Sequence, residues 1–222
     1  NVGVICNVCD VYSNDLQIVN SSATIYGYIS VNNNIVYGFS LRHPLYISDL
    51  NEGLNPRHFR SILQEVYDFD LMNDKLYVLH REETTMKIGI FSSDGNFLSE
   101  IILSDLIPDN TFLSGMEVSS DSKIYLHYYN YIQDIYVLED IGSGNYRASK
   151  INLDETDFLM TEDENNNLFI GYHPINGILS FDKIRSDGTR TRFSTHVTED
   201  ANILYDITYR FGKLYDEIKI NR

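Results

Sequence analysis

Four histidines stand where one apolar run of the sequence ends and the next begins. Two precede a proline, in LRHPLYIS (41–48) and GYHPINGILS (171–180), and two do not, in YVLHREE (77–83) and YLHYYN (125–130). An imidazole can hydrogen-bond through both ring nitrogens or bind a metal, so its recurrence calls for a common explanation. The spacing predicts four copies of one loop in a repeat protein.

The elements that carry these loops can be read from residues 66–103. The runs VYDFDL, LYVLH, KIGIF and NFLSEIIL are separated there by MNDK, a short polar loop and SSDG. Short runs rich in Ile, Tyr and Phe predict strands, and Asp-Gly marks a hairpin turn. We therefore expect four strands joined by short turns, and the same plan can be read over 25–48, 114–152 and 157–194.

The second strand of each repeat is expected to begin at a regular interval. The expected first residues are Ile35, Leu76, Ile124, Leu168 and Leu214, so successive steps are roughly 41 to 48 residues. This is the period of a four-stranded propeller blade, and one blade cannot bury both of its faces alone. We predict an all-β protein, a β-propeller of four-stranded blades that forms one domain over residues 1–222.

The two termini are expected to supply the last blade, which makes about five blades. Inner strands are predicted at about 203–209 and 213–220, and outer strands in NVGVICNV and DLQIVN near the N-terminus. Their union would close the ring and remove exposed sheet edges. The alternative is that the chain is a fragment of a six- or seven-bladed propeller.

The segment DFDLMNDKLYVLHREETTMKIGIFSSDGNFLSEI resembles a blade of the NHL-like β-propellers, including the bacterial six-bladed kind. In those families a strand with an Asp leads to an Asn/Asp-Gly-type turn, an LYV strand and an IxxFxxDGxFL hairpin. Residues 177–193, GILSFDKIRSDGTRTRF, resemble the hairpin half. The resemblance implies a binding scaffold, although lyases and hydrolases occur among such families.

The loop after the second strand and the loop that enters a blade share one rim of a propeller. Loops on a rigid scaffold concentrate binding residues, and Tyr offers a flat apolar face with a hydroxyl. We therefore predict a non-catalytic rim that binds a glycan, a peptide or a protein. Its residues are Arg42, His43, His80, Arg81, His127, Tyr129, Tyr131, Tyr172 and His173. The alternative is that each histidine is a hydrogen-bonding residue between blades, inherited by duplication.

Carboxylates in the first strands and at blade entries raise a second function. Glycoside hydrolases use a pair of carboxylates, one as proton donor and one as base or nucleophile. A carbohydrate-active enzyme, a hydrolase or lyase, would use Glu117, Asp157 and Asp206 near the propeller axis. The alternative is that these acids form turns and solvated surface charge.

The sequence predicts neither a metal nor a cofactor. The motif CNVC holds Cys6 and Cys9, but a zinc site needs two more ligands and no second CxxC or HxxxH is present. We expect both thiols to be ordinary and at least partly buried. The four histidines are expected to lie too far apart to share one metal ion.

The charge balance restricts the partners. Seventeen Lys and Arg residues against 32 Asp and Glu residues give a net charge of −15. This argues against a nucleic-acid partner and against an anionic membrane surface, and no apolar run is long enough to insert into a membrane. Because the chain starts at Asn1 rather than Met, we expect a processed N-terminus and an extracytoplasmic protein, secreted or at the cell surface.

Overall fold

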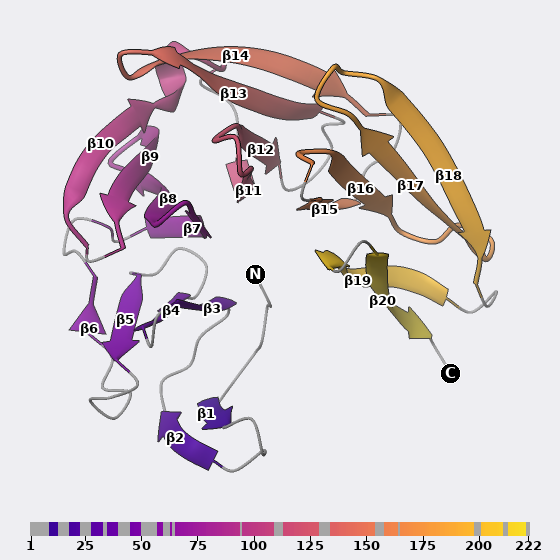
Figure 1. Ribbon diagram of the computed structural model, residues 1–222, viewed down its shortest axis with the longest axis horizontal. Coiled ribbons are helices and arrows are strands. Elements are labelled where there is room, and N and C mark those ends of the chain that lie inside the picture. The colour runs from indigo at the N-terminus through magenta and orange to yellow at the C-terminus, as the bar shows by residue number, and fades with distance from the viewer. Residues whose placement is uncertain are drawn as a thin grey trace. The chain divides into compact units, whose positions relative to one another are not determined.

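A computed structural model describes most of the chain (Figure 1). The described residues are 9–12, 18–22, 28–32, 35–39, 45–49, 57–59, 63, 65–93, 95–108, 113–128, 134–153, 158–163, 165–197, 201–210 and 213–220. Side chains are described for most of these residues between 65 and 197, and among earlier residues for Tyr37, Leu45, Tyr46, Ile47, Phe59 and Leu63.

The chain divides into two compact units, and the first, Asn1–Thr111, contains two antiparallel four-stranded sheets. Blade 1 consists of β3 (Tyr28–Asn32), β4 (Ile35–Phe39), β5 (Tyr46–Asp49) and β6 (Arg57–His58), paired in that order. Blade 2 consists of β7 (Glu65–Met72), β8 (Lys75–Glu82), β9 (Thr85–Ser92) and β10 (Phe97–Ile102), also paired in chain order.

The second unit, Phe112–Arg222, repeats the same plan. Blade 3 consists of β11 (Leu113–Val118), β12 (Ile124–Tyr128), β13 (Asp134–Gly142) and β14 (Asn145–Asn152). Blade 4 consists of β15 (Phe158–Glu162), β16 (Leu168–Tyr172), β17 (Ile178–Ile184) and β18 (Arg190–His196). The four predicted strand–turn repeats therefore each form one four-stranded sheet.

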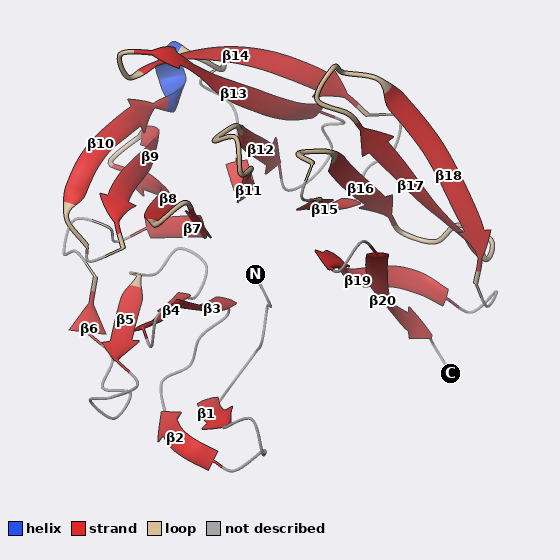
Figure 2. Ribbon diagram, viewed as in Figure 1, coloured by secondary structure: helices blue, strands red, loops and turns tan. Residues whose placement is uncertain are grey.

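Helix is almost absent from the described residues. Figure 2 shows strands throughout and one short 3₁₀ helix, η2 (Leu103–Asp105), which follows β10. No helix in the described part of the chain has the length and apolar content needed to cross a membrane. The predicted all-β class is confirmed.

The terminal strands form two further pairs. β1 (Cys9–Tyr12) pairs with β2 (Ile18–Ser22), and β19 (Ala201–Arg210) pairs with β20 (Lys213–Ile220). The two predicted C-terminal strands are confirmed, and β2 overlaps the predicted strand in DLQIVN. The segment NVGVICNV, residues 1–8, lies outside the described residues. Each pair is a separate two-stranded sheet, so the fifth blade and the single domain over 1–222 stay predictions.

The turn between β7 and β8 shows how the sequence specifies these hairpins. Asn73 and Asp74 both have positive φ, 52° and 58°, in the two-residue connection of MNDK. A hairpin turn of this kind matches the strand twist, and Asn and Asp tolerate the left-handed conformation better than other non-glycine residues. The turn fixes the register in which Met72 pairs with Lys75 and Leu71 with Leu76.

Apolar faces of neighbouring blades pack on one another within each unit. In unit 1, Tyr37 and Leu45 of blade 1 pack with Phe69, Leu76 and Val78 of blade 2. The Tyr37 hydroxyl also donates to the carbonyl oxygen of Ser93 at 2.9 Å. In unit 2, the core between the blades contains Tyr125, Ile135, Val137, Leu168, Ile170, Tyr172 and Ile184. This packing hides from water the faces that a single sheet would expose.

Candidate functional site

The histidines of the predicted rim occupy three different positions of their blades. Relative to Leu76, Ile124 and Leu168, His80 is the fourth residue on, His127 the third and His173 the fifth. His80 and His127 lie inside β8 and β12, and His173 follows the end of β16. Because side chains alternate along a strand, His80 and His127 point to opposite faces of their sheets. The three described histidines are therefore not copies of one loop position.

His80 is buried between blades 1 and 2 rather than displayed on a rim. Its side chain shares a face of β8 with Leu76 and Val78, and only 4% of the residue is exposed. Burial lowers the pKa of His80, although the charges of Glu82 and Glu100 oppose that shift. Its Nδ1 has no hydrogen-bond partner among the described residues. The ligand contact by His80 stays a prediction, although this burial leaves little of the side chain exposed for it.

His127 lies on the face of blade 3 that packs against blade 4. It is half-buried, and its imidazole occupies the space beside Gly115, the residue with which it pairs on β11. A Cβ atom at Gly115 would lie 1.8 Å from Nε2 of His127. Tyr129 and Tyr131, predicted to act beside His127, lie outside the described residues.

Tyr172 is buried in the structure, and its contact with a ligand stays a prediction. Its hydroxyl donates to Oδ2 of Asp182, and the Arg192 guanidinium lies 5.0 Å from its ring centroid. Tyr172 and Asp182 are both 0% exposed. Burial, together with the hydrogen bond to Asp182, raises the pKa of Tyr172. Tyr172 was predicted from its place beside His173, but strand alternation turns it into the core.

Asp182 is a buried charge with several donors. Burial opposes its ionisation, but hydrogen bonds from Arg192, Arg190 and Tyr172 outweigh that cost and lower the pKa of Asp182 to about 2. Arg190 Nη2 lies 2.6 Å from Oδ2, and Arg192 Nε lies 3.0 Å from Oδ1. A buried carboxylate is tolerated when its oxygens are paired in this way.

The loop after β16 presents an apolar tip. Asn176 and Gly177 have positive φ values of 51° and 72°, and Ile175 and Ile178 bridge each other across the turn. Ile175 is 60% exposed and Ile178 is 41% exposed, while His173 at the base of the loop is half-buried. The predicted rim loop of blade 4 therefore carries aliphatic side chains at its tip.

A cavity of about 440 Å³ lies at the corresponding end of blade 2. The turn between β8 and β9 forms one side, and the segment that begins with η2 forms the other. The described lining residues are Thr84, Thr85, Met86, Leu103, Ser104, Ile107 and Pro108. Arg81 pairs with Met86 across the turn, and its Nε lies 3.1 Å from Oε2 of Glu65. Arg42 and His43 lie outside the described residues.

Of the three carboxylates predicted for an enzyme, only Glu117 has a described side chain, so their convergence stays a prediction. Glu117 is half-buried on β11 and pairs with Tyr125. Asp157 lies outside the described residues, and Asp206 is described by its backbone alone, in β19. Within the described part of the chain, no group of three or more His, Cys, Asp or Glu residues is arranged to hold a metal ion.

Glu162, which no sequence motif marks, has an unusual environment among the described acids. Burial raises its pKa to about 7, and the charges of Asp121 and Asp163 add to that shift. The backbone N–H of Ser120 donates to its Oε2 at 3.2 Å, whereas Oε1 is buried without a hydrogen-bond partner among the described residues. One sequence signal could have indicated this burial. Side chains alternate along a strand, so Glu162 lies on the same face of β15 as Met160, which packs against the core.

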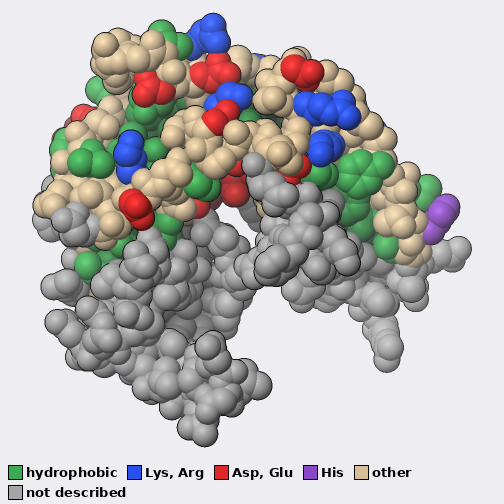
Figure 3. Space-filling model, viewed as in Figure 1, with side chains coloured by type: hydrophobic (Ala, Val, Ile, Leu, Met, Phe, Trp, Pro, Cys, Tyr) green, Lys and Arg blue, Asp and Glu red, His purple; other side chains and the backbone are tan. Residues whose placement is uncertain are grey.

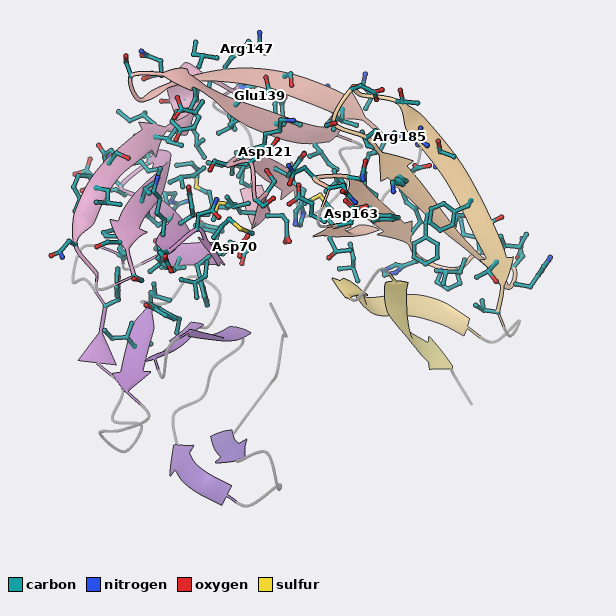
Figure 4. The ribbon with its side chains drawn as sticks, viewed as in Figure 1. Asp70, Asp121, Glu139, Arg147, Asp163 and Arg185 are labelled. Carbon is teal, nitrogen blue, oxygen red and sulfur yellow. The ribbon has the colours of Figure 1, made fainter. Side chains whose placement is uncertain are left out.

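A line of charges extends from this carboxylate across blade 3. Arg147 lies 2.6 Å from Glu139, Lys123 lies 4.0 Å from Glu139, and Lys123 lies 3.3 Å from Asp121. Figure 4 labels Asp121, Glu139 and Arg147 of blade 3 and Asp163 of blade 4. Figure 3 shows Lys and Arg side chains beside Asp and Glu side chains on the visible face of the described part. The described part of this face carries charges of both signs despite the acidic composition.

Comparison with solved structures supports a propeller. The chain is similar to a dihydro-heme d1 dehydrogenase, NirN, solved in complex with DHE, with a TM-score of 0.60 and 10% sequence identity. The match covers 98% of this chain and 48% of that one, so the chain spans about half the length of its neighbour. No family model and no curated protein sequence matches. At this identity the likeness concerns the fold alone, and with the four-stranded sheets it shows that the chain has a β-propeller fold.

Proposed function

We propose that this propeller is a non-catalytic recognition domain that binds a peptide or a loop of a protein partner at its rim. The observation that carries the proposal is the cavity at the end of blade 2. Its volume lies within the range of ligand pockets, about 300–1,000 Å³, and suits one or two side chains. The NHL-like resemblance of this same blade, with its implication of a binding scaffold, supports the assignment.

The chemistry of the cavity favours a peptide over a glycan. Met86, Leu103, Ile107 and Pro108 provide apolar contact, while the hydroxyls of the threonines and of Ser104 can bind peptide N–H and C=O groups. No aromatic side chain is among its described lining residues, so a sugar ring would lack a flat apolar partner there. The exposed Ile175 and Ile178 give the loop of blade 4 a similar preference for apolar partners.

A peptide-display selection against the purified chain tests this function. Peptides that carry an aliphatic anchor should be enriched, and Ser104→Trp, which fills the cavity from an exposed position, should weaken their binding at least tenfold. Ser149→Trp, an exposed substitution on β14, is the matched control and should leave the affinity unchanged. Equal binding by both variants would contradict a role for the cavity.

The same protein sample should be tested on a glycan array and a polysaccharide-hydrolysis panel. Glycan binding that Ser104→Trp does not affect would place recognition elsewhere on the propeller. Turnover that is lost on replacing Glu117 by Gln would favour the carbohydrate-active enzyme, with Glu117, Asp157 and Asp206 as its predicted carboxylates.

A further inference from the structure

Two turns meet at the contact between blades 3 and 4. One is the Ser119–Lys123 turn between β11 and β12, and the other begins at Glu162, the last residue of β15, and leads to β16. The backbone N–H of Ser120 donates to Oε2 of Glu162 at 3.2 Å, and the Ser120 hydroxyl bonds Oδ1 of Asn166. These are hydrogen bonds between residues more than forty positions apart. They connect blade 3 to blade 4, which also share an apolar core.

The two oxygens of Glu162 have unequal surroundings. Oε2 accepts from Ser120, while Oε1 is buried and has no hydrogen-bond partner among the described residues. A carboxylate oxygen that is buried without a donor is costly when the group is charged and cheaper when it carries a proton. Asp121, on the opposite blade, adds repulsion to the charged form. The hydrogen bond from Ser120 favours the ionised carboxylate, but burial and the charge of Asp121 outweigh it, so ionised Glu162 disfavours the packed arrangement of the two turns as a whole.

Several charges face Glu162, and they act in both directions. Asp121 and Asp163 disfavour its ionisation, and Lys123 favours it. Tyr125 lies close on β12, Glu139 lies beyond it on β13, and Lys183 on β17 pairs with Asp163 at 3.2 Å. β19 packs against β15 and carries Tyr205, Asp206, Tyr209 and Arg210, whose side chains lie outside the described set, as does Glu164. Among the described groups the acids outnumber the bases.

We propose that protonation of Glu162 strengthens the contact between blades 3 and 4, in which the Ser119–Lys123 turn of blade 3 packs against blade 4. Protonation removes the repulsion between Glu162 and Asp121. The neutral carboxyl can still accept from Ser120 through its carbonyl oxygen, and it no longer holds a charge beside the buried Oε1. The pKa of about 7 places this change at neutral pH, so a small acidification changes the strength of the contact. The device is separate from the rim cavity and does not depend on the proposed ligand.

Nuclear magnetic resonance of the full chain tests the proposal directly. In the wild type, the amide signal of Ser120 should titrate with a midpoint near pH 7, as the Glu162 carboxyl signal does. Its hydrogen exchange, relative to the intrinsic rate at each pH, should slow about fivefold or more between pH 8 and pH 6. In Glu162→Gln, which mimics the neutral carboxyl, both effects should disappear.

Two further variants separate this group from its neighbours. Asp121→Asn should lower the midpoint of the Glu162 signal, because a repelling charge is removed. Glu83→Gln, at an exposed turn of blade 2, is the control and should retain the wild-type titration of Ser120. A Ser120 amide that does not titrate near neutral pH would overturn the proposal. So would a titration that persists unchanged in Glu162→Gln, since another group would then be responsible.

Discussion

The imidazole of His127 occupies the position that a side chain on Gly115 would need. The two residues pair across β11 and β12, and a Cβ atom at Gly115 would approach Nε2, Cε1 and Cδ2 of His127 to 1.8, 2.3 and 2.7 Å. All three distances are shorter than the 3.0 Å below which a Cβ atom does not contact a non-bonded atom. His127 can therefore take its observed position only because residue 115 has no side chain. Gly115 and His127 form one packing unit in blade 3.

Gly115→Ala should therefore destabilise the protein through His127. We expect a loss of about 1–3 kcal/mol in the free energy of unfolding, since the ring must leave its place. In a His127→Ala background the same substitution should cost much less, and a double-mutant cycle by urea denaturation measures the difference. The same cost in both backgrounds would show that backbone strain at residue 115, not the imidazole, is responsible.

Tyr172→Phe should affect stability and not ligand binding. The substitution keeps the ring beside Arg192 but removes the hydroxyl that donates to the buried Asp182. A hydrogen bond to a buried charged group contributes about 1.5–3 kcal/mol, so we expect a loss of that order in urea denaturation. Affinity for a selected peptide should stay within twofold of wild type, and a larger loss would restore Tyr172 to the binding site.

Asp182 should contribute stability that is lost in acid. Its pKa is lowered to about 2 in the folded chain, below the ordinary value of 3.8. Ionised Asp182 thus stabilises the fold fully above about pH 4, and this contribution, about 2 kcal/mol, is lost as the pH falls towards 2. The difference in urea stability between wild type and Asp182→Asn should be largest at neutral pH and shrink between pH 4 and pH 2. Asp140→Asn, at an exposed position, serves as the control, and a pH-independent difference would contradict the assignment.

The blade plan could be predicted because it depends on local signals. Runs such as LYVLH and KIGIF alternate as strands do, and Asn73–Asp74 is a turn that few other residues could form at positive φ. Four sheets with sequential strand order follow from such hairpins alone. The predicted fifth blade is different, because it would join segments about two hundred residues apart, and no local signal specifies such a pairing.

The site residues were harder to predict because one position along a strand decides whether a side chain faces the core or the solvent. His80 and Tyr172 were grouped with exposed loops, yet β8 and β16 carry them into the contacts between blades. Glu162 was missed because its environment is built by the turn of the neighbouring blade, at Ser120 and Asp121, which is remote in sequence. A period-two register could have separated buried from exposed positions, but not identified the partner turn.

The part of the predicted rim on blade 3 can be tested with His127 and Tyr129. Replacing both by Ala should weaken binding of a selected peptide at least tenfold by calorimetry, because two polar side chains of the predicted rim would be removed together. His127→Ala alone is the matched control, since it removes only the residue that packs on Gly115. Circular dichroism melting distinguishes the outcomes. Lost binding with a retained transition supports the rim, whereas lost folding in the single variant assigns His127 to the structure. Unchanged affinity in the folded double variant would show that this part of blade 3 does not contact the peptide. The cavity of blade 2 would then remain the proposed binding site.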